Sequence, residues 1–196
     1  MLTAVILAAG QSRRMGTPKA LLTLRGKTFV EHLIRATRHP RVGITRVVLG
    51  AGAEEIRAKL PAIRPASIIV NPGWRTGQLS SIQAAIRALS AQETEGMILC
   101  PVDHPLIPAK LVAQLIAAFE STGKKIVLPV FHGRRGHPVI FRASLFSELL
   151  AASPEIGARQ VVWAHADDVA EIPTEEQAVI LNLNDPRTLN QAIQKL

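Results

Sequence analysis

A short run of small and basic residues near the beginning of the chain has the composition of a phosphate-binding loop. Residues 7–19 contain two glycines and three fixed cations: Gly10, Gly16, Arg13, Arg14 and Lys19. Glycine lets backbone N–H groups approach an anion closely, Arg grips phosphate oxygens with a two-pronged guanidinium, and Lys supplies a compact charge. The spacing differs from both the GxxxxGK[ST] and the GxGxxG loops. The composition alone therefore indicates either an anion site or a solvated connection between a strand and a helix.

Asp103 is the candidate metal ligand of the sequence. It follows the apolar run of residues 97–102, so we expect it at the carboxyl end of a buried strand. Mg²⁺ is commonly held by one or two carboxylates together with substrate phosphates and water. The alternative is an Asp that caps a turn or a helix before Pro105. We interpret the neighbouring His104 as a surface or loop histidine.

The elements that must position these residues alternate between strands and helices. Apolar runs predict strands at residues 3–7, 44–49, 67–70, 96–100, 126–130, 169–172 and 179–183. Helical spacing of apolar residues predicts helices at 28–37, 54–60, 78–89 and 108–119, over most of 143–164, and at 186–196, while 133–136 predicts a hairpin turn leading into 138–141.

This alternation indicates an α/β fold of one domain over residues 1–196, a three-layer sandwich with a mostly parallel, Rossmann-like sheet. Ligands of such sheets bind at the carboxyl ends of the strands. We therefore expect the 7–19 loop, the segments after the third and fourth strands, and the residues after the last strand to meet at one edge.

Composition excludes several other classes of protein. Apolar residues make up 47% of the 196, aromatic residues only 4%, and Tyr is absent, so the stacking rings of a single-stranded nucleic-acid binder are missing. The net charge is +8, and residues 1–50 hold nine basic residues against one acidic residue, which suits an anionic ligand. The single cysteine, Cys100, lies in an apolar run and is expected to be buried. With no secretion signal and no apolar run of about 18 residues, we expect a cytoplasmic protein without a membrane partner.

The order L-A-A-G-x-S-x-R-M-G-x-x-K in residues 7–19 resembles the signature loop of the MobA-like nucleotidyltransferases, most nearly the molybdenum cofactor cytidylyltransferases. The resemblance implies a fold of the nucleotide-diphospho-sugar transferase type and a loop that wraps a nucleoside triphosphate. Guanylyltransferases of this family usually read LAGG, so Ala9 favours CTP, although uridylyl and other cytidylyl enzymes also carry LAAG. The nucleotide-binding residues implied here are Leu7, Ala8, Ala9, Gly10, Ser12, Arg13, Arg14 and Lys19.

Residues 71–81 resemble the family segment N-P-x-W-x-x-G-[ML]-x-x-S, which orients the nucleotide and reads its base. The resemblance implies four nucleotide-binding residues: Asn71, Gly77, Ser80 and Ser81. Gln78 departs from the usual Met or Leu. A plain capping arrangement at the start of a helix is the alternative. We interpret Trp74 and Trp163 as packing residues.

Two later segments resemble further elements of the family. Residues 136–139 match G-[HN]-P-V, which implies acceptor contacts by Gly136, His137 and Pro138; a loop histidine is the alternative. Residues 182–186, Asn-Leu-Asn-Asp-Pro, resemble the closing N-[IV]-N-T-P element, with Asp185 in place of Thr. The resemblance implies that Asn182 and Asn184 join Asp103 as metal ligands. Alternatively both are turn residues and Asp185 caps the last helix.

The resemblance thus implies a nucleotidyltransferase with Mg²⁺ as its cofactor. It would move a nucleoside monophosphate from an NTP, by Ala9 CTP, onto an acceptor phosphate and release pyrophosphate, with Arg14, Lys19 and Asp103 as catalytic residues. The implied acceptor is molybdopterin carrying molybdenum, and a molybdoenzyme or its chaperone would receive the product. A sugar-1-phosphate or polyol-phosphate nucleotidyltransferase is the alternative within this chemistry. The neutral pair of asparagines also leaves open a catalytically silent nucleotide-binding regulator.

Overall fold

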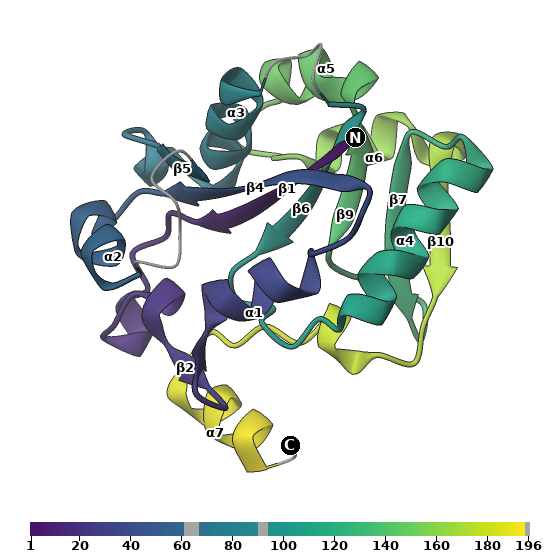
Figure 1. Cartoon of the computed structure of the whole chain (residues 1–196). Helices are drawn as coiled ribbons and strands as arrows, with labels where there is room; N and C mark the ends of the chain where they lie inside the picture. Colours follow the sequence, from purple (N-terminus) through teal and green to yellow (C-terminus); the bar gives the residue numbers. More distant parts are fainter. Residues whose placement is uncertain (61–66, 90–93, 195–196) are drawn as a thin grey trace.

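An eight-stranded sheet forms the centre of the computed structural model, which describes residues 1–60, 67–89 and 94–194 (Figure 1). The strand order is β10-β7-β9-β6-β1-β4-β5, and β8 pairs with β7. The strands are β1 (Leu2–Ala8), β4 (Val42–Leu49), β5 (Ile68–Val70), β6 (Gly96–Pro101), β7 (Ile126–Phe131), β8 (Arg134–Arg135), β9 (Val139–Arg142) and β10 (Val169–Pro173). A separate hairpin joins β2 (Thr23–Leu24) to β3 (Lys27–Thr28).

Helices cover both faces of this sheet. The α-helices are α1 (Phe29–Ala36), α2 (Ala53–Lys59), α3 (Gln78–Ala88), α4 (Ala109–Thr122), α5 (Phe146–Ala151), α6 (Arg159–Ala164) and α7 (Pro186–Gln194). Short 3₁₀ turns are η1 (Arg13–Met15), η2 (Lys19–Leu21), η4 (Trp74–Thr76), η5 (Ala143–Leu145), η6 (Ala166–Asp168) and η7 (Gln177–Val179). One buried cluster joins the sheet to α1, α2 and α4, and a second joins it to α3, α5 and α6, which confirms the three-layer α/β sandwich (Figure 1).

The sequence of the central strand β1 is one nearly continuous apolar run because both of its faces are buried. Leu2, Ile6 and Ala8 point into the first cluster, whereas Val5 and Leu7 point into the second. Both faces of the strand are therefore covered, as is usual in sheets with helices on both sides. Parallel pairing with β4 on one side and β6 on the other brings the carboxyl ends of all three strands to one edge.

The pairing is mostly parallel, as expected, with one reversal inside the sheet. Strand β9 runs antiparallel between β6 and β7, and β8 folds back antiparallel onto β7. The last strand, β10, is again parallel to β7. Strand β9 therefore joins β7 and β10 on one side to β6, β1, β4 and β5 on the other.

Helix α1 begins where its sequence predicts. The Thr28 hydroxyl accepts a hydrogen bond from the Glu31 N–H at 3.2 Å, and the Glu31 carboxylate accepts from the Thr28 N–H at 2.7 Å. This reciprocal capping box satisfies two of the N–H groups that a helix start leaves without partners. The Thr28 hydroxyl also donates to the Glu31 carboxylate at 2.8 Å, and the bonds from the Thr28 N–H and hydroxyl lower the pKa of Glu31 because they favour the ionised carboxylate.

Several predicted elements differ from the structure. Residues 179–183 form no strand: Val179 ends a 3₁₀ turn, and the backbone of the segment bonds to loops, with the Val179 carbonyl accepting from His137 N–H and Leu183 N–H donating to Asp103. The predicted helical stretch 143–164 is broken between α5 and α6, where Pro154 lies and Gly157 has φ 78°.

Other differences concern boundaries and burial. The hairpin after β7 turns at His132 and Gly133, both with positive φ, so Arg134 and Arg135 belong to a strand rather than to the turn. Strand β4 is fully buried only over its last three residues, and Ile44 is 37% exposed. Helix α7 is described to residue 194, so the predicted end at 196 lies outside the described residues.

Cys100 is completely buried, as predicted, and burial raises the pKa of its thiol to about 12. Within the ranges that the structure describes, no helix has both the length and the apolar character needed to cross a membrane.

Candidate active site

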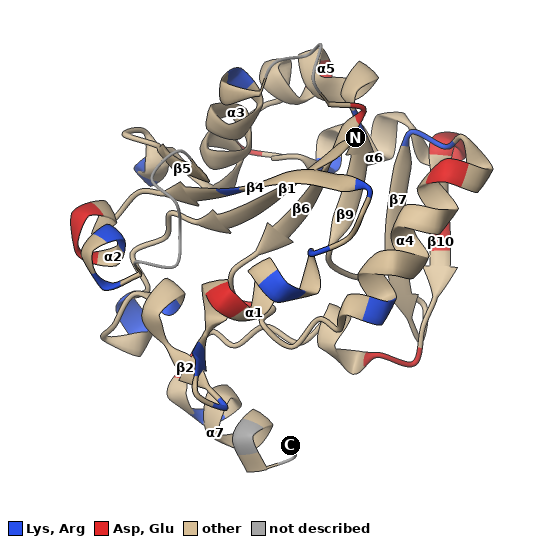
Figure 2. Ribbon diagram, viewed as in Figure 1, with Lys and Arg blue, Asp and Glu red and all other residues tan. Residues whose placement is uncertain are grey.

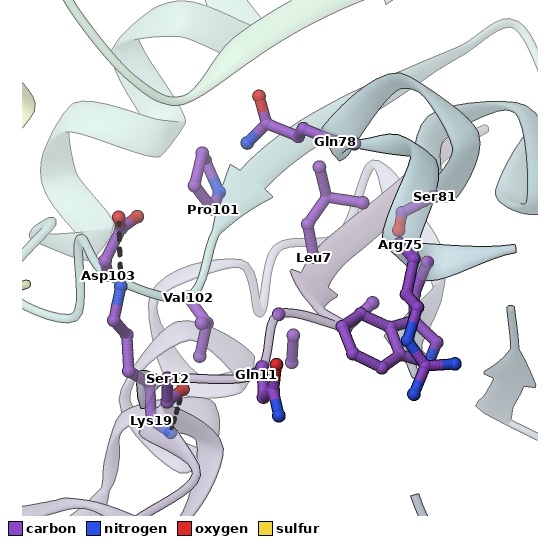
Figure 3. Close-up of a pocket in the computed structure, with 15 residues that line it drawn as sticks. Leu7, Gln11, Ser12, Lys19, Arg75, Gln78, Ser81, Pro101, Val102 and Asp103 are labelled. Atoms are coloured by element: carbon purple, nitrogen blue, oxygen red, sulfur yellow. Dashed lines mark hydrogen bonds and ion pairs between the residues drawn. The ribbon is translucent and has the colours of Figure 1, made fainter. Parts of the chain in front are cut away.

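A cavity of about 330 Å³ opens at the carboxyl ends of β1 and β6 (Figure 3). Its walls come from residues 7–12, from the 3₁₀ turn η4 and the start of α3, and from residues 101–103, with Lys19 at one side. The predicted meeting of the first loop with the segments after the third and fourth strands is therefore confirmed.

The loop after β1 is folded back on itself, and this brings Lys19 into the wall. Ser12 has φ 53° and Gly16 has φ 67°, two left-handed positions within one short loop. The Lys19 N–H donates to the Ser12 hydroxyl at 2.9 Å and closes the loop. Arg13 and Arg14, by contrast, are exposed on η1 and do not line the cavity, and Arg13 donates instead to the Gln11 side chain at 2.7 Å.

Lys19, Asp103 and Asn184 converge although they are far apart in the sequence. The Lys19 ammonium lies 3.6 Å from the Asp103 carboxylate and donates a hydrogen bond to the Asn184 side-chain oxygen (Figure 3 shows the first contact). Leu183 N–H donates to the Asp103 carbonyl at 2.8 Å, which fixes the chain just before Asn184. Asn182 is exposed and meets Asn184 only through a backbone contact of 3.1 Å.

A metal ion that prefers oxygen ligands, such as Mg²⁺ or Mn²⁺, suits this cluster. The Asp103 carboxylate and the Asn184 amide oxygen already face one positive charge, the Lys19 ammonium. These are the oxygen ligands that hard divalent cations take, with substrate phosphates completing the shell. In the described part of the chain, no group of three or more His, Cys, Asp or Glu residues could hold a metal by itself.

Asn71 holds the segment before α3 in place. Its side chain is 4% exposed and donates to the hydroxyls of Ser80 and Ser81 at 2.9 and 3.0 Å, while its oxygen accepts from Gly73 N–H at 2.9 Å. Ser81 and Gly77 line the cavity, whereas Asn71 and Ser80 do not. The structure thus brings two of the four residues predicted in this segment to the cavity, and the other two support them.

His104, next to Asp103, corrects the prediction of a surface or loop histidine. His104 is only 4% exposed rather than a surface residue, and its Nδ1 lies 3.2 Å from the Ala178 carbonyl. Its ring centroid lies 5.0 Å from that of His137. Burial lowers the pKa of His104, although the Asp103 carboxylate acts in the opposite direction and raises it. Burial, with a smaller contribution from His104, also lowers the pKa of His137 to about 4.

Residues 177–184, which we call the C-terminal strap, cross the sheet edge beside these histidines. His137 N–H donates to the Val179 carbonyl at 2.9 Å. A Cβ at Gly136 would lie 2.5 Å from that same carbonyl oxygen, so only glycine allows the strap to approach this closely.

A second cavity, of about 390 Å³, lies next to the first. It is bounded by α3, by β9 and by residues 154–159, and His137 lines it whereas Gly136 and Pro138 do not. Gln78 lines both cavities.

Sequence reasoning missed several lining residues of the first cavity. Gln11, Trp74, Arg75, Gln78 and Val102 line the first cavity. Trp74, Arg75 and Gln78 belong to the segment of residues 71–81 that resembles the family motif, and that motif was the available signal. Trp74 packs against the second core cluster, as expected, and it also forms part of the wall, with the Arg75 guanidinium 4.6 Å from its ring. Trp163 was also expected to pack but is 60% exposed.

The chain resembles known proteins in both its sequence and its fold. Residues 4–169 match the family of the MobA-like NTP transferase domain. The molybdenum cofactor guanylyltransferase of Shewanella sp. (strain ANA-3) is 31% identical over 189 residues, covering 93% of this chain and 90% of that protein. The nicotine blue oxidoreductase of Paenarthrobacter nicotinovorans is 33% identical over 169 residues, covering 80% and 79%. The crystal structure of Rv0371c from Mycobacterium tuberculosis H37Rv has a TM-score of 0.83 at 22% identity, covers 98% of this chain and 97% of its own, and has also been solved in complex with manganese.

Proposed function

The chain belongs to the MobA-like NTP transferase family and is a nucleotidyltransferase, and from this premise we propose that it transfers CMP from CTP to the phosphate of a molybdopterin-type acceptor. The observation that carries the proposal is the convergence of Lys19, Asp103 and Asn184 beside a nucleotide-sized cavity at the carboxyl edge of the sheet. The acceptor class is supported by the name of the relative from Shewanella.

The transfer makes one phosphoanhydride bond and breaks another. An oxygen of the acceptor phosphate attacks the α-phosphorus of CTP, the bond to the β-phosphate breaks, and pyrophosphate leaves. A phosphate monoester is largely ionised near neutral pH, so the attack requires no general base. Lys19 neutralises negative charge on the triphosphate as the bond breaks, and the folded loop of residues 7–12 holds the nucleotide against β1. Arg14, exposed on η1, reaches the phosphates only if the loop closes on the bound nucleotide.

Asp103 and Asn184 would hold Mg²⁺ together with the nucleotide phosphates. When bound, the ion supplies charge neutralisation and orientation of the triphosphate. Asn182 is the weaker candidate, because its exposed side chain makes no contact with the Asp103 cluster. Since one carboxylate and neutral amides bind Mg²⁺ weakly, occupancy should depend on the nucleotide.

Ala9 supports CTP rather than GTP. Its side chain is 6% exposed and packs in the second core cluster at the wall of the first cavity, where the methyl group takes space that glycine would leave free. Cytosine is smaller than guanine and tolerates that narrower wall. The guanylyltransferase names of the relatives favour GTP, which is therefore the competing nucleotide.

Thermal unfolding with each nucleotide tests the proposal. A ligand at about 100 times its dissociation constant stabilises the folded state by about 2.7 kcal/mol, which raises Tm by roughly 5–10 °C for a chain of this size. We expect the largest shift with CTP and Mg²⁺ and a smaller one when EDTA replaces the metal. A larger shift with GTP would reassign the base, and no shift with any of CTP, GTP, UTP or ATP would favour a catalytically silent protein.

Asp103→Asn separates catalysis from folding. The variant keeps the shape of the side chain and removes one charge, so we expect pyrophosphate release to fall by about 100-fold or more with little change in Tm. Asp167→Asn, on η6 away from the cavity, is the matched control. Near-normal turnover of Asp103→Asn would remove this carboxylate from the mechanism.

A further inference from the structure

A third cavity, of about 510 Å³, lies between the β2–β3 hairpin, helix α1 and residues 105–109. It shares no lining residue with the two cavities described above. The His32 Nε2 atom of α1 donates to the Leu24 carbonyl of the hairpin at 2.7 Å, so a hydrogen bond holds two of its walls together. A cavity of this size between fixed elements can take a small molecule.

Positive charge gathers around this third cavity. Arg25 and Lys27 of the hairpin line it together with His32 and Arg35 of α1, and among the described residues no acidic side chain does. Figure 2 shows basic residues in blue on the hairpin and on the adjoining α1. Three of the nine basic residues of the segment 1–50 therefore face this cavity, whereas the first cavity is lined by one of the nine.

The cation on α1 is not neutralised in the way that a neighbouring arginine is. Arg41 forms ion pairs with two glutamates, whereas the Arg35 side chain is exposed and makes no hydrogen bond or ion pair with a described residue. Glu31 is the single acidic residue among residues 1–50, and its carboxylate accepts from the N–H and the hydroxyl of Thr28 rather than lining the cavity. A ligand that binds here would therefore supply the missing negative charge.

Arg25 occupies a backbone position that suits asparagine or glycine. Leu24 pairs with Lys27, so Arg25 and Gly26 form the two-residue turn between them, with φ values of 48° and 73°. Asn-Gly is the preferred pair where both turn residues have positive φ, and a longer side chain there costs conformational energy. Residues held in such conformations are concentrated at functional sites. The turn thus carries a cation at the cavity at a conformational cost.

We infer that the third cavity is a binding site for a diphosphate, an anion with two linked phosphate groups. Arg35 holds one phosphate group from the side of α1, and Arg25 and Lys27 hold the other from the hairpin. Arginine binds phosphate oxygens with a two-pronged guanidinium and lysine with a compact charge, so cations on two walls suit two adjacent phosphates. Inorganic pyrophosphate and a nucleoside diphosphate share this chemistry. The inference goes beyond the proposed nucleotidyl transfer and does not depend on it, because the lining residues differ.

The test is calorimetric titration of the full chain with pyrophosphate and with CDP, in EDTA and at low salt. Every protein carries Lys19→Gln, which removes the cation of the first cavity and leaves the third cavity intact. We expect Arg35→Gln and Lys27→Gln each to weaken binding by about tenfold, the equivalent of one charged hydrogen bond. Arg38→Gln, exposed just beyond α1, and Lys59→Gln at the end of α2 remove the same charges outside the cavity and should bind normally.

Arg25→Asn separates the charge from the shape of the turn. Asparagine suits the positive φ of this position, so we expect the variant to fold and to unfold cooperatively on heating. Binding of pyrophosphate should nevertheless weaken by about tenfold, because one of the three fixed cations is lost. Unchanged affinity in a folded Arg25→Asn protein would show that this arginine does not contact the ligand, which would overturn the inference.

The remaining outcomes are equally decisive. No binding of either diphosphate to the Lys19→Gln protein would overturn the inference, as would equal weakening by the cavity variants and their controls. Equal affinity for inorganic phosphate would contradict the two-phosphate site, and displacement of pyrophosphate by polyglutamate would reassign the cavity to an acidic protein segment. If Arg35→Gln weakens both ligands, the tighter of the two identifies the source of the diphosphate. Failure of the nucleotide Tm shift in the wild type would refute the proposed function and leave these results unaffected.

Discussion

Replacing the buried His137 should make the protein less sensitive to acid. The pKa of His137 is lowered from 6.5 to about 4, mainly by burial and secondarily by His104. Between these pH values the unfolded chain binds a proton at this position and the folded chain does not, so stability falls as pH falls. The stabilising contribution is complete above pH 6.5 and is lost progressively down to about pH 4.

The magnitude follows from the two pKa values. The full difference corresponds to about 3 kcal/mol, of which about 2 kcal/mol is already lost at pH 5. Urea unfolding of the wild type and of His137→Asn at pH 7.5 and pH 5.0 measures this contribution. We expect the wild type to lose about 2 kcal/mol more than the variant between the two pH values.

The comparison isolates His137 from other titrating groups. Carboxylates whose pKa is lowered, such as Glu31 and Glu95, act in both proteins and cancel in the difference. His104, whose pKa is also lowered by burial, is retained in the variant. Equal acid losses in the two proteins would mean that His137 titrates as an exposed histidine does, and the burial argument would be wrong.

Three further substitutions test contacts described above. Lys19→Gln should reduce the stabilisation by nucleotide by about 2 kcal/mol, because a charge-assisted contact to phosphate is lost; the Tm shift measures it. Gly136→Ala should cost about 1–3 kcal/mol in urea unfolding, since the added Cβ would lie 2.5 Å from the Val179 carbonyl oxygen. Thr28→Ala should cost about 1 kcal/mol in the same assay, because the capping box with Glu31 is broken.

Each of these variants has a control of the same chemical type. Lys110→Gln removes a cation from the exposed start of α4, Gly43→Ala places a Cβ no closer than 3.4 Å to Met1, and Thr122→Ala removes an exposed hydroxyl near the end of α4. We expect little effect from any of the three. A variant that behaves like its control would show that the contact in question does not stabilise the protein or its complex.

The local sequence was sufficient to predict most elements and the sheet edge that carries the site. The predicted start of α1 at residue 28 is confirmed, because its capping depends on Thr28 and Glu31, which are neighbours three residues apart. Residues 7–19 and Asp103 could be assigned to one edge because parallel strands share their carboxyl ends.

The structural features that the sequence did not predict depend on partners far away in the chain. Residues 179–183 have the apolar composition of a strand, but their backbone partners are His137 and Asp103, more than 40 residues away. The burial of His104 likewise depends on the strap that covers it, because Ala178 bonds to its ring. The family resemblance assigned Arg13 and Arg14 to the nucleotide, whereas the loop turns at the left-handed Ser12 and only Lys19 of the three cations lines the first cavity. Pro154 and Gly157 did signal the break between α5 and α6, and the helical reading of that stretch overlooked them.

The reversed strand β9 also has an evolutionary consequence. Residues 109–173 contain α4, β7, β8, β9, α5, α6 and β10 without interruption, so most of one half of the sheet is a single continuous piece of chain. Strands β1, β4 and β5 precede that piece, and only β9 forms a ladder with β6 at the seam. One recombination event could therefore exchange most of the second cavity's walls while preserving the loop and strands around the first. Such an exchange would replace the surroundings of the second cavity in one step and leave the loop of residues 7–12 unchanged.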